Sequence, residues 1–167
     1  MTVLTPRQLS DRALIEDVLM RHCRGVDRMD LELVEACFSA DAHIKYEPIV
    51  DGSRAEYLAF LRRPDALGGL TRTMHFASTL LIDLDGDVAH TELYARAHHT
   101  STDEHHYAGA FVTTWLRYLD RFERRGGVWR IVDRVVVREW MRRDVAGMWE
   151  DVPAPSRRDR SDPSYRR

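Results

Sequence analysis

Asp27, His75 and Arg134 stand in otherwise apolar stretches of the sequence and are residue types that acid–base chemistry uses. An imidazole titrates near neutral pH, and a carboxylate that accepts from one ring nitrogen fixes its tautomer and leaves the other nitrogen free for a proton. A guanidinium can stabilise developing negative charge. Each residue also has an ordinary structural explanation: a helix-end carboxylate, a satisfied core histidine, and a solvated strand residue or ion-pair partner. Their meaning therefore depends on the elements that position them.

The first half of the chain carries the patterns of three helices. Apolar residues recur every three or four positions from Gln8 to Val26, which predicts an amphipathic helix that buries one face. Asp30 is suited to cap a second, shorter helix that forms a hairpin with the first. Ser53 and Glu56 have capping-box spacing, so a third helix is expected to begin at Ser53 and to stop before Pro64.

The second half of the chain is predicted to form two long hairpins. Residues 73–83 and 88–100 flank a tight-turn signal at 85–86, and residues 106–123 and 128–141 flank a glycine pair. Strands of ten or more residues are longer than average, which indicates a strongly curved, mostly antiparallel sheet with bulges. Helices followed by strands indicate an α+β fold in which the three helices cover one face of the sheet and enclose a pocket.

Length and charge narrow the class of protein. A chain of 167 residues predicts one domain, here 8–148, between a flexible N-terminus at 1–7 and a disordered C-terminal tail at 149–167. A net charge of −2 gives no general attraction to nucleic acid, and no apolar run approaches the roughly 20 residues that span a bilayer. Without a secretory signal, we expect a cytoplasmic protein with neither a nucleic-acid nor a membrane partner. Cys23 and Cys37 lack CxxC spacing and are expected to be buried free thiols.

Several segments together carry a resemblance to a known family. They are the helix end at 21–30, Phe38-Ser39-Ala40-Asp41-Ala42, Thr73-Met74-His75-Phe76, the turn region 83–89, the stretch 118–125, Trp129-Arg130-Ile131 and Trp140. In this order they resemble the SnoaL-like group of the nuclear-transport-factor-2-like superfamily, which includes scytalone dehydratase, bile acid 7α-dehydratase and hexachlorocyclohexane dehydrochlorinase. The resemblance covers roughly residues 8–141 and implies a cone-like α+β barrel around a pocket.

The resemblance also implies roles for individual residues. Asp27 and His75 would face each other inside the pocket, His75 as the general base and Asp27 as the residue that orients it. Proton transfer by a positioned group typically contributes about 10²–10⁴-fold to a rate. Arg134 resembles the arginine that some relatives place near the site, where it would stabilise negative charge. The chemistry needs neither a metal ion nor a cofactor, and the chain has no glycine-rich phosphate motif.

Further polar candidates for the pocket are His22, Tyr46 and His98. His22 stands where many relatives carry a tyrosine, and His98 lies near a position that lines the pocket of scytalone dehydratase. Tyr46 could supply a phenol as proton donor to a leaving group. Neighbouring strand residues point to opposite faces, so the histidine pairs at 98–99 and 105–106 do not predict a metal site. Apart from His98, we expect the histidines of these two pairs to be solvated.

Three kinds of function remain open. The leading hypothesis is a cofactor-independent, dehydratase-like lyase that uses His75 and Asp27 on a hydrophobic cyclic or polyketide-like molecule. An isomerase or aldol cyclase could use the same pair, since an enolate can be reprotonated or can attack a carbonyl. A non-catalytic binding or accessory protein, like the small subunit of ring-hydroxylating dioxygenases, is the third. In each case the outer face of the sheet, with Trp115, Trp129 and Val135–Val137, is expected to pack against another copy in a homodimer or homotrimer.

Overall fold

The structure is a computed structural model that describes residues 3–145 and 156–165. The helical elements are α1 (Pro6–Arg28), α2 (Leu31–Ala36), α3 (Arg54–Arg62) and two short 3₁₀ turns, η1 (Leu67–Gly69) and η2 (Pro163–Tyr165). The strands are β1 (Phe38–Tyr46), β2 (Val50–Ser53), β3 (Leu70–Asp85), β4 (Val88–Ser101), β5 (Ala110–Arg125) and β6 (Val128–Val145). The predicted α+β class and the two long hairpins are confirmed.

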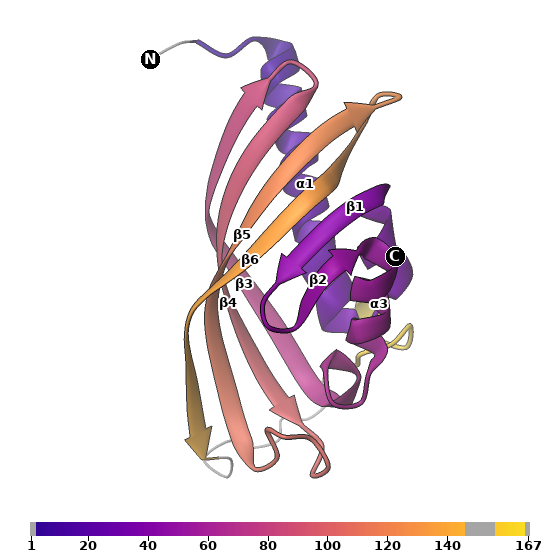
Figure 1. Cartoon of the computed structure of the whole chain (residues 1–167), viewed down its shortest axis with the longest axis vertical. Coiled ribbons are helices and arrows are strands. Elements are labelled where there is room, and N and C mark those ends of the chain that lie inside the picture. Colours follow the sequence, from indigo (N-terminus) through magenta and orange to yellow (C-terminus); the bar gives the residue numbers. More distant parts are fainter. Residues whose placement is uncertain (1–2, 146–155, 166–167) are drawn as a thin grey trace.

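The strands form one curved, mixed sheet in the order β2-β1-β6-β5-β4-β3, in which β1 and β6 are parallel and the other pairs antiparallel. Figure 1 shows α1 along one face of this sheet and α3 beside β1 and β2. Register shifts in the β3–β4 and β5–β6 pairs bend the long strands, as their length predicts. The sheet does not close into a barrel, because β2 and β3 remain its edges and the helices cover the inside of the curve.

Side-chain caps fix where the helices begin. Thr5 and Gln8 form the reciprocal hydrogen bonds of a capping box, so α1 begins at Pro6, two residues earlier than the apolar pattern predicts. The Asp30 side chain accepts from the backbone of the third residue of α2, and Ser53 caps α3 as predicted. The predicted caps of α2 and α3 are therefore confirmed, whereas the Thr5 cap of α1 was not predicted.

One extra residue in β6 decides which side chains of that strand enter the core. Phe122 of β5 pairs with Ile131, but Arg121 pairs with Asp133, so Val132 is inserted and inward-facing residues change from odd to even numbers. Trp129 is therefore buried on the helix-covered face, and its indole nitrogen donates to an aspartate of α1 at 3.0 Å. The prediction that Trp129 lies on the outer face is wrong.

Alternation along the same strand divides the three valines at 135–137 between the two faces. Val136 is buried in the core, whereas Val135 borders a hollow on the outer face.

Cys23 and Cys37 are buried free thiols, as expected, and burial raises the pKa of Cys23 to about 12. No helix in the described ranges is long and apolar enough to span a membrane.

Residues 156–165, called here the C-terminal segment, lie against the end of α1. Asp162 accepts from Arg28, and the Tyr165 hydroxyl donates to Asp30 at 2.8 Å. The disordered tail that the composition predicts for 149–167 stays a prediction; the described part of it is held by ion pairs and hydrogen bonds rather than by apolar contacts. Residues 149–155 and 166–167 lie outside the described part of the chain.

Candidate active site

Asp27, near the end of α1, and His75, near the start of β3, form a hydrogen-bonded pair. Nδ1 of His75 lies 2.7 Å from Oδ1 of Asp27, and the backbone N–H of His75 donates to Oδ2 at 3.0 Å. Because the carboxylate can only accept, Nδ1 carries the proton and Nε2 remains an acceptor. The side chains are 5% (His75) and 11% (Asp27) exposed. The pair has the geometry of a histidine base held in one tautomer by a carboxylate.

Local packing places this carboxylate. At Gly25, an added Cβ would lie 2.7 Å from Cγ2 of Val34, so only glycine allows α2 to approach α1 this closely. The chain then turns through Met29, whose φ of 52° ends the helix just after Asp27. On the strand side, the Thr73 hydroxyl lies 3.4 Å from Oδ1 of Asp27. The aspartate is therefore constrained from both the helix and the sheet.

A cavity of about 280 Å³ lies beside His75 and is called here the inner cavity. Its wall is mostly aromatic and aliphatic and includes Val26, Tyr46, Tyr57, Phe60, Leu61, Leu67, Leu70, His99, Leu116, Tyr118 and Met141. No described residue forms a hydrogen bond with Nε2 of His75, which is therefore available to a molecule in this cavity. An apolar wall with a few polar groups is typical of sites for small organic molecules.

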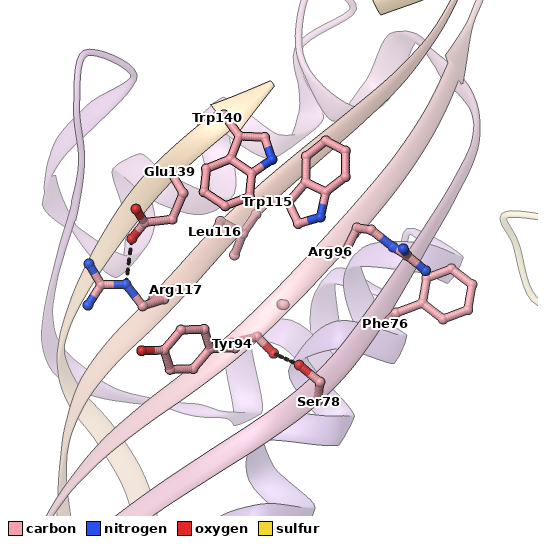
Figure 2. Close-up of a pocket in the computed structure, with 10 residues that line it drawn as sticks. Phe76, Ser78, Tyr94, Arg96, Trp115, Leu116, Arg117, Glu139 and Trp140 are labelled. Carbon is pink, nitrogen blue, oxygen red and sulfur yellow. Dashed lines mark hydrogen bonds and ion pairs between the residues drawn. The ribbon is translucent and has the colours of Figure 1, made fainter. Parts of the chain in front are cut away.

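A larger hollow of about 760 Å³ lies on the opposite face of the sheet. Figure 2 shows this outer groove, bordered by Phe76, Tyr94, Trp115 and Trp140. Two of its charged groups, Arg117 and Glu139, are joined by a hydrogen bond of 2.6 Å, and the guanidinium of Arg96 lies over the Phe76 ring. Neither member of the Asp27–His75 pair borders it, so the inner cavity is the better candidate for chemistry.

Arg134 and His22 belong to a buried cluster rather than to the wall of the inner cavity. Two nitrogens of Arg134 donate to Asp120, each at 2.6 Å, and both side chains are 0% exposed. The third nitrogen donates to Nε2 of His22 at 2.8 Å, and the Tyr57 hydroxyl lies 3.3 Å from the same atom. We call His22, Tyr57, Asp120 and Arg134 the buried cluster. It reaches the cavity through Tyr57, which borders both.

His22 is neutral in this cluster. Burial lowers its pKa well below the usual value, and the charge of Arg134 lowers it further. Since Nε2 accepts from Arg134, the proton of the ring is on Nδ1, which has no hydrogen-bond partner among the described residues. The expectation that His22 and Arg134 face the pocket directly is therefore not met.

Tyr46 lines the inner cavity, as expected of a candidate donor. Burial raises the pKa of its phenol, and the guanidinium of Arg138 lies 5.5 Å from the ring centre. Burial also raises the pKa of Tyr57, a cavity residue that sequence reasoning missed. Both phenols thus keep their protons at neutral pH and can donate hydrogen bonds.

His98 and His99 have the opposite placement from the one expected. His98 lies on the outer face and stacks on Phe111, with ring centres 5.2 Å apart. His99 lines the inner cavity, bonds to the Thr73 hydroxyl at 2.9 Å, and has its pKa lowered to about 3 by burial. The alternation of buried residues at 89, 93, 95 and 97 in β4 was the signal that could have identified His99.

His105 and His106 both line the inner cavity, from the loop before β5. They are not in a strand, so the expected alternation does not apply to them. His105 is buried and bonds to the Ala66 carbonyl at 3.2 Å, which corrects the expectation that it is solvated. In the ranges 3–145 and 156–165, no group of three or more histidine, cysteine or acidic side chains is arranged to hold a metal ion.

Comparisons with known proteins agree with this architecture. Residues 7–135 match the sequence profile of the SnoaL-like domain. A provisionally named scytalone dehydratase from Novosphingobium aromaticivorans superposes with a TM-score of 0.72 at 21% identity, over 83% of this chain and 91% of that one. A hexachlorocyclohexane dehydrochlorinase from Novosphingobium barchaimii gives 0.75 at 18% identity, over 87% and 97% of the two chains. At these identities the structural likeness shows the fold. A search of curated protein sequences gave no match.

Proposed function

The chain belongs to the SnoaL-like family, and from this premise we propose that it is a lyase of the dehydratase type, with His75 as general base and Asp27 as its orienting partner. The supporting observation is the 2.7 Å contact between Nδ1 of His75 and Asp27, which leaves Nε2 as an acceptor beside the inner cavity. The two structural neighbours are named as a dehydratase and a dehydrochlorinase; both names describe eliminations and favour the same class.

In the proposed reaction, a substrate places an acidic C–H bond against Nε2 of His75. The imidazole takes the proton, the electrons of the C–H bond form a double bond, and the leaving group departs with its bonding electrons from the adjacent carbon. Asp27 stabilises the imidazolium that forms, because its carboxylate already accepts the proton on Nδ1. When the leaving group is hydroxide, the imidazolium passes its proton to that oxygen and water leaves; a halide leaves as the anion, and the imidazolium then returns its proton to solvent.

Tyr46 and Tyr57 are proposed to stabilise charge on the substrate. Both line the inner cavity, and burial raises the pKa of each phenol, so they act as hydrogen-bond donors and not as bases. Donors aimed at an oxygen that becomes negatively charged lower the barrier to enolate formation. Arg134 contributes indirectly, through the contact of the buried cluster with Tyr57.

The proposed substrate is a compact hydrophobic ring compound, including polyketide-like molecules, with one or two oxygen or halogen substituents. A volume of about 280 Å³ lies at the lower end of the range of about 300–1,000 Å³ that ligand pockets have. The aromatic and aliphatic wall favours a ring, and the few polar side chains favour a small number of polar atoms.

The experiment is a turnover screen of cyclic β-hydroxy ketones and a chlorinated cyclohexane, with products identified by mass spectrometry and NMR. We expect His75→Ala and Asp27→Asn each to lower turnover by about 10²–10⁴-fold. His98→Ala is the matched control, because it removes the same side chain from the outer face. Full turnover by both dyad variants would show that the assignment is wrong.

The products distinguish the remaining enzymatic alternatives. Loss of water or halide identifies a lyase, whereas an isomer of unchanged mass or a new carbon–carbon bond identifies an isomerase or an aldol cyclase that uses the same pair. An accessory protein would bind ring compounds without turnover, and co-purification with an iron-containing subunit would identify it.

We also propose that the outer groove is a contact between copies in a homodimer or homotrimer. Trp140 is 60% exposed and lies 5.7 Å, between ring centres, from Trp115 (Figure 2). Large exposed aromatic side chains gathered on one face are typical of interaction surfaces. Light scattering at micromolar concentration should give a multiple of 19.5 kDa, and Trp140→Glu should shift it towards the monomer.

A further inference from the structure

Arg158, in the C-terminal segment, contacts the end of α1 at the residue that carries the catalytic carboxylate. Its Nε donates to the carbonyl of Asp27 and its Nη2 to the carbonyl of Val26, each at 3.4 Å. The last carbonyls of a helix lack donors within the helix, so a cationic side chain at this place satisfies them and complements the helix dipole. Arg158 thus binds the backbone of Asp27 itself.

The same guanidinium also binds the chain that leads to His75. Its Nη1 donates to the carbonyl of Leu67 at 2.9 Å and to that of Leu70 at 2.5 Å. Leu67 lies in η1 and Leu70 is the first residue of β3, the strand that contains His75. One side chain therefore joins the helix that carries Asp27 to the strand that carries His75.

We propose that Arg158 is a positioning residue for the Asp27–His75 pair. It holds the end of α1 and the start of β3 at a fixed separation, and so keeps the carboxylate against Nδ1 of the imidazole. Its four backbone partners are Asp27 itself and three residues that line the inner cavity, namely Val26, Leu67 and Leu70. The catalytic consequence rests on the proposed function; the positioning does not.

The side-chain type suits this task. A guanidinium has five donors in a planar fork and can bind several carbonyls at once, whereas a lysine ammonium is a single point on a flexible stem. Burial lowers the pKa of Arg158 to about 10, with the charge of Asp27 acting in the opposite direction. The guanidinium is still charged at neutral pH.

Other contacts hold the C-terminal segment in place, so that Arg158 is presented to its four carbonyls. Arg24 of α1 donates to the Ser164 hydroxyl at 3.0 Å, and Arg28 contacts Asp162 at 3.3 Å. The segment lies outside residues 7–135, which match the family profile. Arg158 therefore lies outside the part of the chain that the family profile describes.

The test uses protein labelled with ¹⁵N-histidine and needs no substrate. The proton on Nδ1 of His75 is observed by NMR, is assigned by its loss in His75→Asn, and its exchange with water is measured. We expect Arg158→Ala to accelerate this exchange at least about 10-fold, because the hydrogen bond to Asp27 opens more often. Methylguanidinium added to Arg158→Ala should restore slow exchange. The Arg158→Lys variant should exchange faster than Arg158→Ala does with methylguanidinium present.

Arg160→Ala is the matched control, because Arg160 lies in the same segment with a side chain 67% exposed, and among the described residues it contacts acidic groups and the Tyr165 ring. Unchanged exchange in Arg158→Ala, or an equal change in Arg160→Ala, would overturn the proposal. If Arg158→Ala does not fold, Arg158→Gln is measured in the same way and judged by the same two outcomes.

Turnover separates this proposal from the proposed function. Where a substrate is found, Arg158→Ala should lower kcat about 10- to 100-fold with KM changed less than about 2-fold, since misplacement of a base by 1 Å costs about 10²-fold. If His75→Ala retains turnover while Arg158→Ala still accelerates exchange, the function is wrong and the positioning role stands. If exchange stays slow in Arg158→Ala while His75→Ala is inactive, the positioning role is wrong and the proposed function stands.

Discussion

His75 and His22 each have a charged partner, but the partners occupy different nitrogens. At His75 the carboxylate of Asp27 accepts a hydrogen bond from the N–H at Nδ1 and leaves Nε2 as a free acceptor beside the inner cavity. At His22 the guanidinium of Arg134 occupies the acceptor Nε2, and the remaining N–H on Nδ1 is buried without a described partner. One ring is therefore suited to accept a proton and the other is not.

The charge of the partner therefore decides which ring nitrogen of a buried histidine stays available. An anionic partner holds the proton on one nitrogen and leaves the other as an acceptor, whereas a cationic partner occupies the acceptor itself. At His22, burial lowers the pKa and the charge of Arg134 lowers it further. The Asp27–His75 pair is accordingly the candidate for chemistry, and the buried cluster is a structural support behind Tyr57. Four measurements test this division.

The largest effect is expected when the orienting carboxylate becomes an amide. Asp27→Asn should lower kcat by about 10²–10⁴-fold, because the neutral amide no longer stabilises the imidazolium or secures the reactive tautomer. Steady-state kinetics on a substrate from the screen measure this, with circular dichroism to verify folding. A kcat within 2-fold of the wild type would show that Asp27 does not support His75 in the reaction.

The next effect concerns stability and the buried cluster. Arg134→Met should lower the free energy of unfolding by about 3–5 kcal/mol, because it leaves Asp120 buried, charged and unpaired. Urea unfolding measures the loss. The double variant Arg134→Met/Asp120→Leu should recover most of it, since both polar partners are then absent. A cost below about 1 kcal/mol for the single variant would contradict the structural role.

The pH dependence of stability should reveal the neutral histidines. His99 has a folded pKa of about 3 against an ordinary value of 6.5, so between these values the unfolded chain binds more protons than the folded one. Stability should therefore fall as the pH drops from about 6.5 towards 3, by up to about 1.4 kcal/mol per pH unit for each such histidine. Urea midpoints at pH 7, 6 and 5 measure the slope, and His99→Asn should flatten it by about one proton.

The smallest effect is expected for thiol labelling, which reports opening near His22. Burial raises the pKa of the neighbouring Cys23 to about 12, so its thiolate is scarce and shielded at neutral pH. We expect labelling of native protein to be at least about 10-fold slower than that of the unfolded chain. Arg134→Met should accelerate it and Asp27→Asn should not; equal acceleration in both would mean that the two regions open together.

The caps, the helices and the two hairpins could be predicted from sequence because their causes are local. Asp30 and Ser53 bond to backbone groups within three residues, and the apolar stripe of α1 needs only its own periodicity. The Asp27–His75 pair joins residues 48 positions apart. No spacing rule implies such a contact, and its prediction depended on the family resemblance.

The errors have different causes, and only the one in β6 depends on a neighbouring strand. Trp129 and Arg134 both face inward because Val132 is an extra residue, which the register with β5 reveals and the sequence of β6 does not. His99, rather than His98, faces the cavity because the buried side of β4 carries the odd-numbered residues. Arg158 lay in a segment judged by its lack of apolar residues, whereas its contacts are to backbone carbonyls, which composition does not report.

The extra residue Val132 gives β6 a property that matters for evolution and for protein engineering. Ahead of it odd-numbered side chains enter the core, and from Arg134 to Val136 even-numbered ones do. Deletion of Val132 would therefore restore plain alternation along β6, with Asp133 still opposite Arg121 and Arg134 still facing inward opposite Asp120. A relative without this residue would keep the same buried cluster, and its alignment to this chain would need a gap of one residue inside a continuous strand.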